Sequence, residues 1–176
     1  MPDDVRIRAA TQADAHAIAE IHVDGWRWAY EGLVPPALLD SLSVERREAR
    51  WTEWFAQHRP GWAVFVAEGK SGTVGFVSCG PCNDPDAGPE TGEVYAIYLR
   101  HGVQGQGVGR NLFARASEHL RDSGFRQATL WVLAENAPTR RFYERAGWTP
   151  DGAEKTEDWN GYPLKEVRYR MRPSDR

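Results

Sequence analysis

A run of alternating glycines has the spacing in this sequence that most plainly suggests chemistry. Residues 104–109 read Gln-Gly-Gln-Gly-Val-Gly and are followed by Arg110. Glycine allows the backbone to approach a ligand closely, and amide N–H groups at the start of a helix converge on anions. We expect this loop to bind a pyrophosphate, with Arg110 adding positive charge. A tight turn between a strand and a helix is the alternative that needs no ligand.

Two common phosphate-binding loops fit the segment less well. A P-loop ends in Gly-Lys-Ser/Thr, which is absent here. The dinucleotide fingerprint G-x-G-x-x-G would require its third glycine at the position of Arg110. Glu135, at the end of the next expected strand, could still serve as its ribose-binding carboxylate. A dinucleotide-binding domain therefore stays open as an alternative.

The two cysteines lie in a Cys79-Gly80-Pro81-Cys82 motif like that of thioredoxin-type oxidoreductases. The first thiol of such a motif is reactive because it lies at a helix N-terminus. Here the motif leads into residues 83–89, whose two prolines and one glycine indicate a loop. A zinc site would need a second pair of ligands, and none is visible. We therefore expect thiols at the end of a strand, without a redox function and without a metal.

The composition is that of a globular protein of one domain. Among 176 residues, 41% are hydrophobic and 27% are charged. The net charge of −3 argues against a nucleic-acid binder, which needs a basic surface. No run approaches the ~20 apolar residues of a membrane span, and the first residues lack the apolar stretch of a signal peptide. We expect a cytoplasmic protein without a membrane partner.

The strands that must position the glycine loop follow from alternating apolar residues and from turn signals. Asn160-Gly161 indicates a hairpin between two final strands, the second from Glu166 to Met171. The other strands are expected at 62–68, 72–79, 93–99 and 128–133, after a short one near Val5.

Helical spacing fills most of the remaining chain. Thr11 and Asp14 resemble a capping box before a helix that reaches about Tyr30. A proline pair introduces a second helical stretch, and the glycine loop opens a helix that runs to about Asp122. Asn136 should begin another. This order of elements predicts one mixed α/β domain.

The glycine loop and a second segment together resemble a known family. Residues 104–109 fit the Q/R-x-x-G-x-G/A acetyl-CoA motif of the GNAT superfamily of N-acetyltransferases. Residues 136–148 resemble its second signature, an asparagine seven residues before a tyrosine and then a glycine-aromatic pair. The resemblance begins at Glu93 and covers about forty residues strongly. One departure is His101, where many members have proline before the loop.

The resemblance implies a single GNAT domain over residues 1–176, with its acetyl-CoA-binding core at about 93–148. The implied fold is a central, mostly antiparallel sheet of six to seven strands flanked by about four helices. Acetyl-CoA is the implied co-substrate, no metal is implied, and a homodimer is possible because many members form one.

The resemblance also implies which residues hold coenzyme A. Backbone groups of Ile97 and Leu99 would pair with the pantetheine arm as an added strand would, and an amide near Leu99 would polarise the thioester carbonyl. Asn136 could bond the cofactor, although it is also a suitable helix N-cap. The full set is Ile97, Leu99, Gln104, Gly105, Gln106, Gly107, Val108, Gly109, Arg110 and Asn136.

Tyr143 and Glu93 are the candidate catalytic residues. Tyr143 matches the family's tyrosine that protonates the departing thiolate, with a packed core tyrosine as the alternative. An alkyl amine near pKa ~10.4 is almost entirely protonated at neutral pH, so a general base should help. Strand alternation would put Glu93 on the face of Tyr95, Ile97 and Leu99. A solvated glutamate is the alternative.

The acceptor side should involve the first helix and the loop after it. Trp26, Trp28, Tyr30 and Tyr95 are the candidate substrate-binding residues, since aromatic rings can enclose a cation or an apolar group. Core packing is the alternative for tryptophans. The acidic loop at 84–90 could attract cations or be merely solvated.

The predicted function is the transfer of acetyl from acetyl-CoA to a primary amine of a small molecule, by direct attack in a ternary complex. The acceptor could be a polyamine, an amino acid or an antibiotic-like compound. The alternatives are a protein N-terminal or lysine acetyltransferase and a non-catalytic domain that binds coenzyme A or a dinucleotide.

Overall fold

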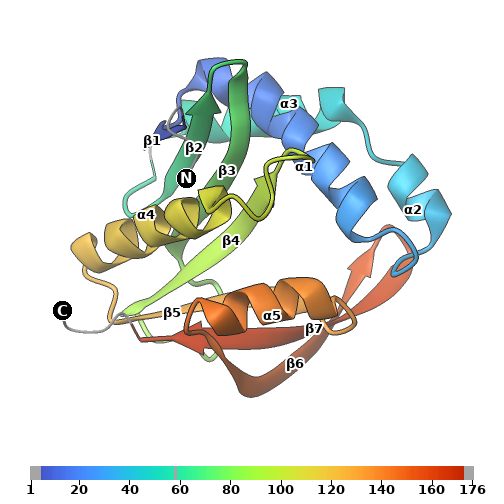
Figure 1. Cartoon of the computed structure of the whole chain (residues 1–176). Coiled ribbons are helices and arrows are strands. Elements are labelled where there is room, and N and C mark those ends of the chain that lie inside the picture. Colours follow the sequence, from blue (N-terminus) through green and yellow to red (C-terminus); the bar gives the residue numbers. More distant parts are fainter. Residues whose placement is uncertain (1–4, 58, 173–176) are drawn as a thin grey trace.

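The apolar strands pair into one twisted sheet in the computed structural model, which describes residues 5–57 and 59–172 (Figure 1). The strands are β1 (Arg6–Ala9), β2 (Ala63–Gly69), β3 (Gly72–Pro81), β4 (Thr91–Leu99), β5 (Gln127–Leu133), β6 (Thr149–Trp159) and β7 (Tyr162–Met171). The helices are α1 (Ala15–Ala29), α2 (Pro36–Asp40), α3 (Val44–Ala56), α4 (Val108–Asp122) and α5 (Ala137–Arg145), and a 3-10 turn, η1 (Gln12–Asp14), precedes α1.

The seven strands lie in the order β1-β2-β3-β4-β5-β7-β6. Every neighbouring pair is antiparallel except β4 and β5, which are parallel and are connected through α4. The expected mostly antiparallel sheet of six to seven strands is confirmed, and five α-helices flank it where about four were expected.

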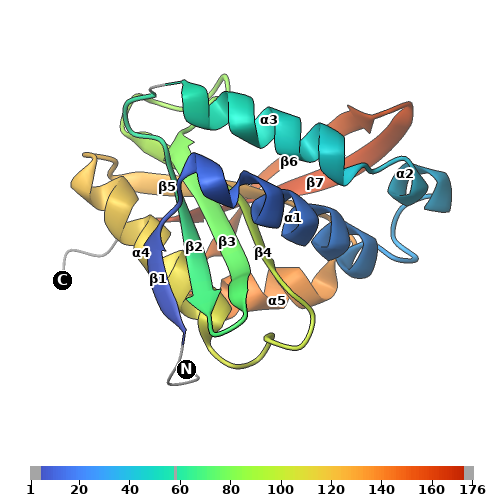
Figure 2. The ribbon, with the colours of Figure 1, turned by 90° about the horizontal axis from the view of Figure 1, so that it is seen from above.

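Helices cover both faces of the sheet (Figure 2). On one face, α4 buries Leu112 and Leu120 against Val77 and the neighbouring strands. On the other face, Ile18 from α1 and Trp51 from α3 enclose Phe76. The buried residues of α1 and α4 recur at about the 3.6-residue period of a helix, and such an apolar stripe must be buried.

Side-chain caps set the helix starts as predicted. The amide of Thr11 donates to the Asp14 carboxylate at 2.8 Å, which completes the expected capping box. The Asn136 side chain accepts from the amide of Thr139 at 3.3 Å and so begins α5.

β4 and β7 begin earlier than alternation alone predicted. β4 begins at Thr91 rather than Glu93, because Thr91 pairs with Gln127 of β5. β7 begins at Tyr162 rather than Glu166, because the predicted Asn160-Gly161 hairpin pairs Tyr162 with Trp159. In both cases the partner strand extends the element beyond its apolar stretch.

Candidate active site

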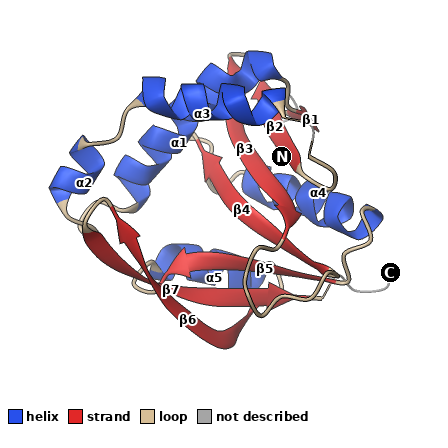
Figure 3. Cartoon of the chain, turned by 180° about the vertical axis from the view of Figure 1, so that it is seen from behind, coloured by secondary structure: helices blue, strands red, loops and turns tan. Residues whose placement is uncertain are grey.

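β4 and β5 pair at one end and then separate (Figure 3). Their register covers Thr91–Glu93 against Gln127–Thr129 and stops there. From Val94 to Leu99, β4 therefore has no strand partner on its β5 side within the described chain. Such an edge offers backbone donors and acceptors that an extended ligand can pair with.

A cavity of about 510 Å³, here the loop cavity, lies at this separation. The exposed edge of β4, the glycine loop and α5 form most of its wall. Of the predicted cofactor-binding residues, it is lined by Ile97, Leu99, Gln104, Gly105, Gly107, Gly109, Arg110 and Asn136.

The glycine loop has the backbone that an anion cradle requires. Gly105 has φ +77° and Gly107 has φ +84°, in the left-handed region that favours glycine, and nothing lies within 4 Å of a Cβ built at Gly105. Gly107 is the N-cap of α4, so the amides of the first α4 turn begin directly at the cavity.

Two predicted loop residues differ from the rest. Val108 begins α4 and is fully buried in the core, so only its backbone can serve a ligand. The side chain of Gln106 donates to the carbonyl of Gly102 at 2.8 Å and braces the turn instead of lining the loop cavity.

Tyr143 lies in α5 with its ring against Phe113 and lines the loop cavity. Its side chain is almost completely buried, and this burial raises the pKa of the hydroxyl above its usual value of 10.0. The group therefore holds its proton at neutral pH. Tyr143 packs in the core and also lines the cavity, so a role in packing and a role in catalysis do not exclude each other.

A second cavity of about 660 Å³, here the aromatic cavity, lies between α1, α3 and the strands β4 to β7. Trp26, Tyr30 and Tyr95 line it, as predicted for the acceptor side. Trp26 stacks on Trp159 with ring centroids 4.1 Å apart. Tyr95 stacks on Trp62 at 4.8 Å, and its hydroxyl donates to the Pro81 carbonyl.

Trp28 lies elsewhere than its neighbour Trp26. Two residues along a helix turn a side chain by about 200°, so the two rings leave α1 on nearly opposite sides. The Trp28 ring is 57% exposed, lines the loop cavity and meets the ring of His101 at 5.8 Å. The structure therefore places Trp28 on the wall of the loop cavity and not in the aromatic cavity.

The two cavities share part of their walls. The hydroxyls of Tyr30 and Tyr98 are 2.9 Å apart at this boundary. The residues that line both cavities are Tyr30, Tyr95, Ala96, Tyr98, Trp131 and Glu166. A ligand in one cavity would thus lie next to a ligand in the other.

Glu93 lines the aromatic cavity, but the predicted face of β4 was wrong. Ser78 pairs with Ala96 and the next residue, Cys79, pairs with Val94, so Tyr95 is the extra residue of a β-bulge. The bulge shifts the alternation by one residue. Ile97 therefore packs toward α4, whereas Glu93, paired with Gly80, faces the aromatic cavity.

The environment of Glu93 suits a base that works near neutrality. Burial, together with the nearby negative charge of Asp84, raises the pKa of its carboxyl from 4.5 to about 7. At neutral pH the carboxyl is then divided between its two protonation states, which is the condition for accepting a proton in one step and releasing it in another.

Glu166 of β7 is a site residue that the sequence analysis missed. Its side chain is 7% exposed on the shared wall, and Lys155 lies 3.4 Å from its Oε2 atom. Burial raises the pKa of this carboxyl. The signal was a glutamate two residues after the buried Leu164 of the same strand, at the spacing that places both on one face.

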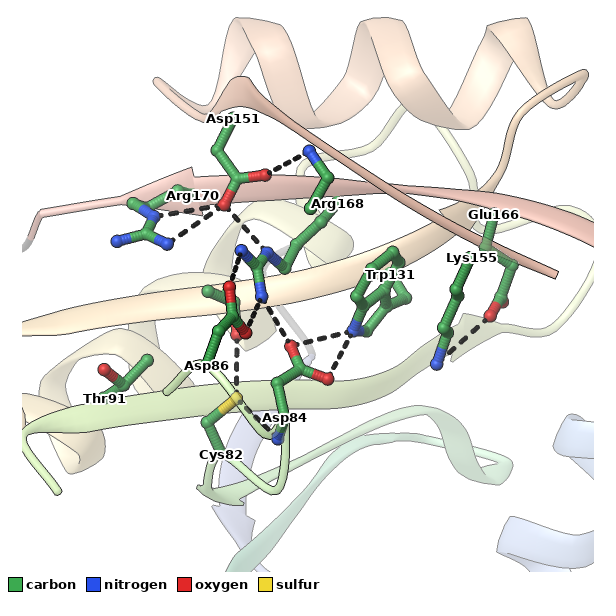
Figure 4. A network of polar contacts seen from close by, with 12 residues as sticks. Cys82, Asp84, Asp86, Thr91, Trp131, Asp151, Lys155, Glu166, Arg168 and Arg170 are labelled. Atoms are coloured by element: carbon green, nitrogen blue, oxygen red, sulfur yellow. Dashed lines mark hydrogen bonds and ion pairs between the residues drawn. The ribbon is translucent and has the colours of Figure 1, made fainter. Parts of the chain in front are cut away.

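The acidic loop after β3 is anchored to β7, so the prediction of a solvated loop is wrong for Asp84 (Figure 4). Arg168 donates to Asp84 at 3.0 Å and to Asp86 at 2.7 Å, and it also pairs with Asp151 at 2.8 Å. Asp84 further accepts from the Trp131 indole at 3.1 Å. These carboxylates hold the loop to β7, and the Asp84 side chain is only 14% exposed whereas that of Asp86 is 63% exposed.

The cysteines have the environment expected of structural thiols. Cys79 is buried within β3, and the segment after Cys82 is a loop, as predicted. Burial raises the pKa of Cys79 to about 12 and that of Cys82 to about 11. Neither thiol is a nucleophilic thiolate at neutral pH.

Within residues 5–57 and 59–172, no group of three or more His, Cys, Asp or Glu side chains could hold a metal ion. No helix in the same part of the chain has the length and apolar character needed to cross a membrane.

Comparison with known proteins agrees with the geometry. The family described as "Acetyltransferase (GNAT) family" matches residues 16–148. The chain is 38% identical over 165 residues to the uncharacterized N-acetyltransferase YuaI of Bacillus subtilis, covering 93% of this chain and 90% of that protein. It is 29% identical over 153 residues to a mycothiol acetyltransferase of Saccharomonospora viridis, covering 84% of this chain but only 47% of that protein.

The fold is also that of a solved acetyltransferase. The PaiA N-acetyltransferase of Thermoplasma acidophilum, crystallised in complex with coenzyme A, superposes with a TM-score of 0.72 at 18% identity, over 96% of this chain and 98% of that one. The family resemblance stated from the glycine loop and the Asn136–Trp148 segment is therefore confirmed. The chain belongs to the GNAT family and is an N-acetyltransferase that uses acetyl-CoA.

Proposed function

We propose that the enzyme acetylates a primary amine of a small molecule by direct attack, with acetyl-CoA in the loop cavity and the acceptor in the aromatic cavity. The observation that carries the proposal is the common wall of the two cavities, where Tyr30, Tyr98 and Glu166 line both. A thioester and an amine held where the two cavities adjoin would meet without a carrier on the protein.

The loop cavity has the groups that coenzyme A needs. The amides of residues 105–109 and the side chain of Arg110 would hold the pyrophosphate, because backbone N–H groups at a helix start favour anions. The unpartnered edge of β4 near Ile97 and Leu99 would pair with the amides of the pantetheine arm. Asn136 caps α5 and also lines this cavity, so its amide nitrogen stays available to the ligand.

Glu93 would take the proton of the acceptor ammonium, directly or through water. With a pKa of about 7 its carboxylate is available at neutral pH and is a stronger base than an exposed glutamate. The neutral amine then attacks the thioester carbon, the C–N bond forms and the C–S bond breaks.

Tyr143 would give its proton to the departing sulfur and regain one from solvent. Its raised pKa keeps the hydroxyl protonated until that step. Glu93 lines the aromatic cavity and Tyr143 lines the adjoining loop cavity. A candidate base and a candidate acid at these places favour an enzyme over a non-catalytic domain that only binds coenzyme A.

A small-molecule acceptor is favoured over a protein N-terminus or lysine. The aromatic cavity, at about 660 Å³, lies within the range typical of small-ligand pockets, roughly 300–1,000 Å³. A relative named for acetylation of mycothiol supports the same choice.

The test combines binding with turnover. Calorimetry should give saturable binding of acetyl-CoA, and a panel of small amines should release free thiol from it only when enzyme is present. If acetyl-CoA binds but only peptides with free N-termini or lysines react, the acceptor class is wrong. If acetyl-CoA at millimolar concentration gives neither heat nor a thermal shift, the whole proposal fails.

A further inference from the structure

α3 carries a cation within its inward-facing stripe of aromatic residues. Arg47, Trp51 and Trp54 stand at positions i, i+4 and i+7, and residues at this spacing share one face of a helix. All three line the aromatic cavity. An arginine at such a position is unusual, because inward-facing positions of an amphipathic helix are normally apolar.

Arg47 is half-buried and its guanidinium has no hydrogen bond or ion pair within the described residues. Four other charged residues of the cavity, on β6 and β7, are engaged. Lys155 lies 3.5 Å from Glu157 and 3.4 Å from Glu166. Asp158 accepts the amide of Gly161 at 2.8 Å.

The groups next to Arg47 leave it without a counter-charge. His22 stacks on Tyr98 with ring centroids 5.0 Å apart, and burial lowers its pKa well below the usual 6.5, so it is neutral. Arg50, one turn along α3, lines the same cavity and adds a second positive charge. Partial burial lowers the pKa of Arg47, which reflects the free-energy cost of an unpaired buried cation.

We propose that Arg47 binds the carboxylate of the acceptor, so that the substrate is an amine that also carries an acid group, of the amino-acid type. The inference rests on the proposed function, because it assumes that the aromatic cavity holds the acceptor. A guanidinium binds a carboxylate through two parallel, charge-assisted hydrogen bonds, and water-poor aromatic walls strengthen them.

The placement of charge also excludes other acceptors. The amine end would lie near Glu93, and the acid end near α3, where Arg47 and Arg50 are. A polyamine or an aminoglycoside would bring a further cation against these two arginines, and like charges in a partly buried site repel. The cavity therefore discriminates by the charge at the end of the acceptor that does not react.

The test compares matched acceptors. The common L-amino acids and their decarboxylated amines, such as phenylalanine with phenethylamine and tryptophan with tryptamine, are assayed with acetyl-CoA by thiol release. We expect kcat/KM to be higher for the amino acid of the best pair by roughly 10- to 100-fold, the range for a hydrogen-bonded charge pair. Phenylacetate, which lacks the amine, should inhibit competitively against that amino acid.

Variants assign the preference to one side chain. Arg47→Met should remove the preference and the phenylacetate inhibition while leaving the affinity for acetyl-CoA unchanged, because Arg47 does not line the loop cavity. Arg47→Lys should restore part of both. Arg46→Met is the matched control, because Arg46 is an exposed neighbour on the same helix that donates to the Ser41 carbonyl and does not line the cavity.

The outcomes distinguish failure of the carboxylate site from failure of the proposed function. If decarboxylated amines react as well as amino acids, or if Arg47→Met leaves the preference intact, the carboxylate site is overturned while the proposed function stands. If only polyamines or aminoglycosides react, the substrate class is overturned. If no amine reacts although acetyl-CoA binds, the proposed function itself fails.

Discussion

Burial acts in the same direction on Glu93 and Tyr143, yet its consequences for their proposed roles differ. Removing a side chain from water disfavours its charged form, so the pKa of each group rises. For Glu93 the rise ends near neutrality and produces a stronger base. For Tyr143 it moves the pKa further from neutrality, which keeps the hydroxyl protonated but makes it a weaker acid. The same physical effect therefore favours the role of Glu93 more than that of Tyr143.

Tyr143→Phe should lower kcat by about 100-fold, within the range typical of general acid catalysis, and leave the dissociation constant of acetyl-CoA unchanged. The phenyl ring keeps the contact with Phe113 while the proton donor is lost. Steady-state kinetics and calorimetry measure the two quantities. Tyr169→Phe is the control, because that buried hydroxyl bonds Arg140 and Glu144 and does not line either cavity. An unchanged kcat in Tyr143→Phe would remove its acid role.

Glu93→Gln should change the pH dependence of the reaction. The ratio of wild-type to variant kcat/KM, measured with one acceptor so that the ionisation of that amine cancels, should rise with pH and level off above about pH 7. This follows because only the ionised carboxylate accepts a proton. A ratio that does not vary with pH would mean that another group is the base.

The stability of the same variant provides its control. The folded-state pKa of Glu93 lies above its unfolded value, so its contribution to stability is fully present below pH 4.5 and is lost as the pH rises through about 7. Glu93→Gln should therefore melt at the same or a higher temperature than the wild type at pH 8. Lost activity could then not be attributed to unfolding.

At the scale of elements, the glycine loop and α4 form one unit, in which Gly107 both caps the helix and lines the loop cavity. Gly107→Trp should abolish acetyl-CoA binding in calorimetry, because the indole would occupy the anion cradle. Any residue other than glycine is also strained at φ +84°, by about 1–2 kcal/mol. Gly102→Trp is the matched control, since Gly102 has φ +94° in the preceding turn and does not line the cavity. Binding that survives in Gly107→Trp but not in Gly102→Trp would place the cradle elsewhere.

Local signals were sufficient to predict most elements, and long-range pairing accounts for the errors. The start of α5 at Asn136 and the Asn160-Gly161 turn depend on neighbouring residues alone, so the sequence predicts them directly. The bulge at Tyr95 depends on how β3 pairs with β4, and the sequence of β4 alone does not predict it. For the same reason the face of Glu93 was wrong although its place in the site was predicted.

Charged contacts between distant segments could not be predicted from the sequence, because they also depend on long-range pairing of strands. Asp84 and Arg168 are 84 residues apart, and only the folded sheet brings them together. Without that partner the aspartates of the loop could only be read as solvated or as a cation attractant. Trp28 is a different case, because the turn of about 200° between its side chain and that of Trp26 follows from helix geometry and could have been derived from the sequence.

For the molecule as a whole, Arg168 ties the loop before β4 to both strands of the final hairpin. Arg168→Met should lower the free energy of unfolding by about 3 kcal/mol, because it leaves carboxylates in a partly buried site without their partner. Urea unfolding measures this. Arg6→Met, which removes an exposed ion pair with Glu68, should cost less than about 1 kcal/mol. If both variants lose the same free energy of unfolding, the Arg168 cluster stabilises the fold no more than an exposed ion pair does.

The aromatic cavity also determines the intrinsic fluorescence of this protein. Six of the eight tryptophans of the protein, at positions 26, 51, 54, 62, 131 and 159, line this cavity. Indole emission depends on the polarity around the ring, so most of the intrinsic fluorescence should report on whether the cavity holds water or a guest. Every step of acceptor entry and product departure can therefore be followed in unlabelled enzyme, with emission from the protein itself as the signal.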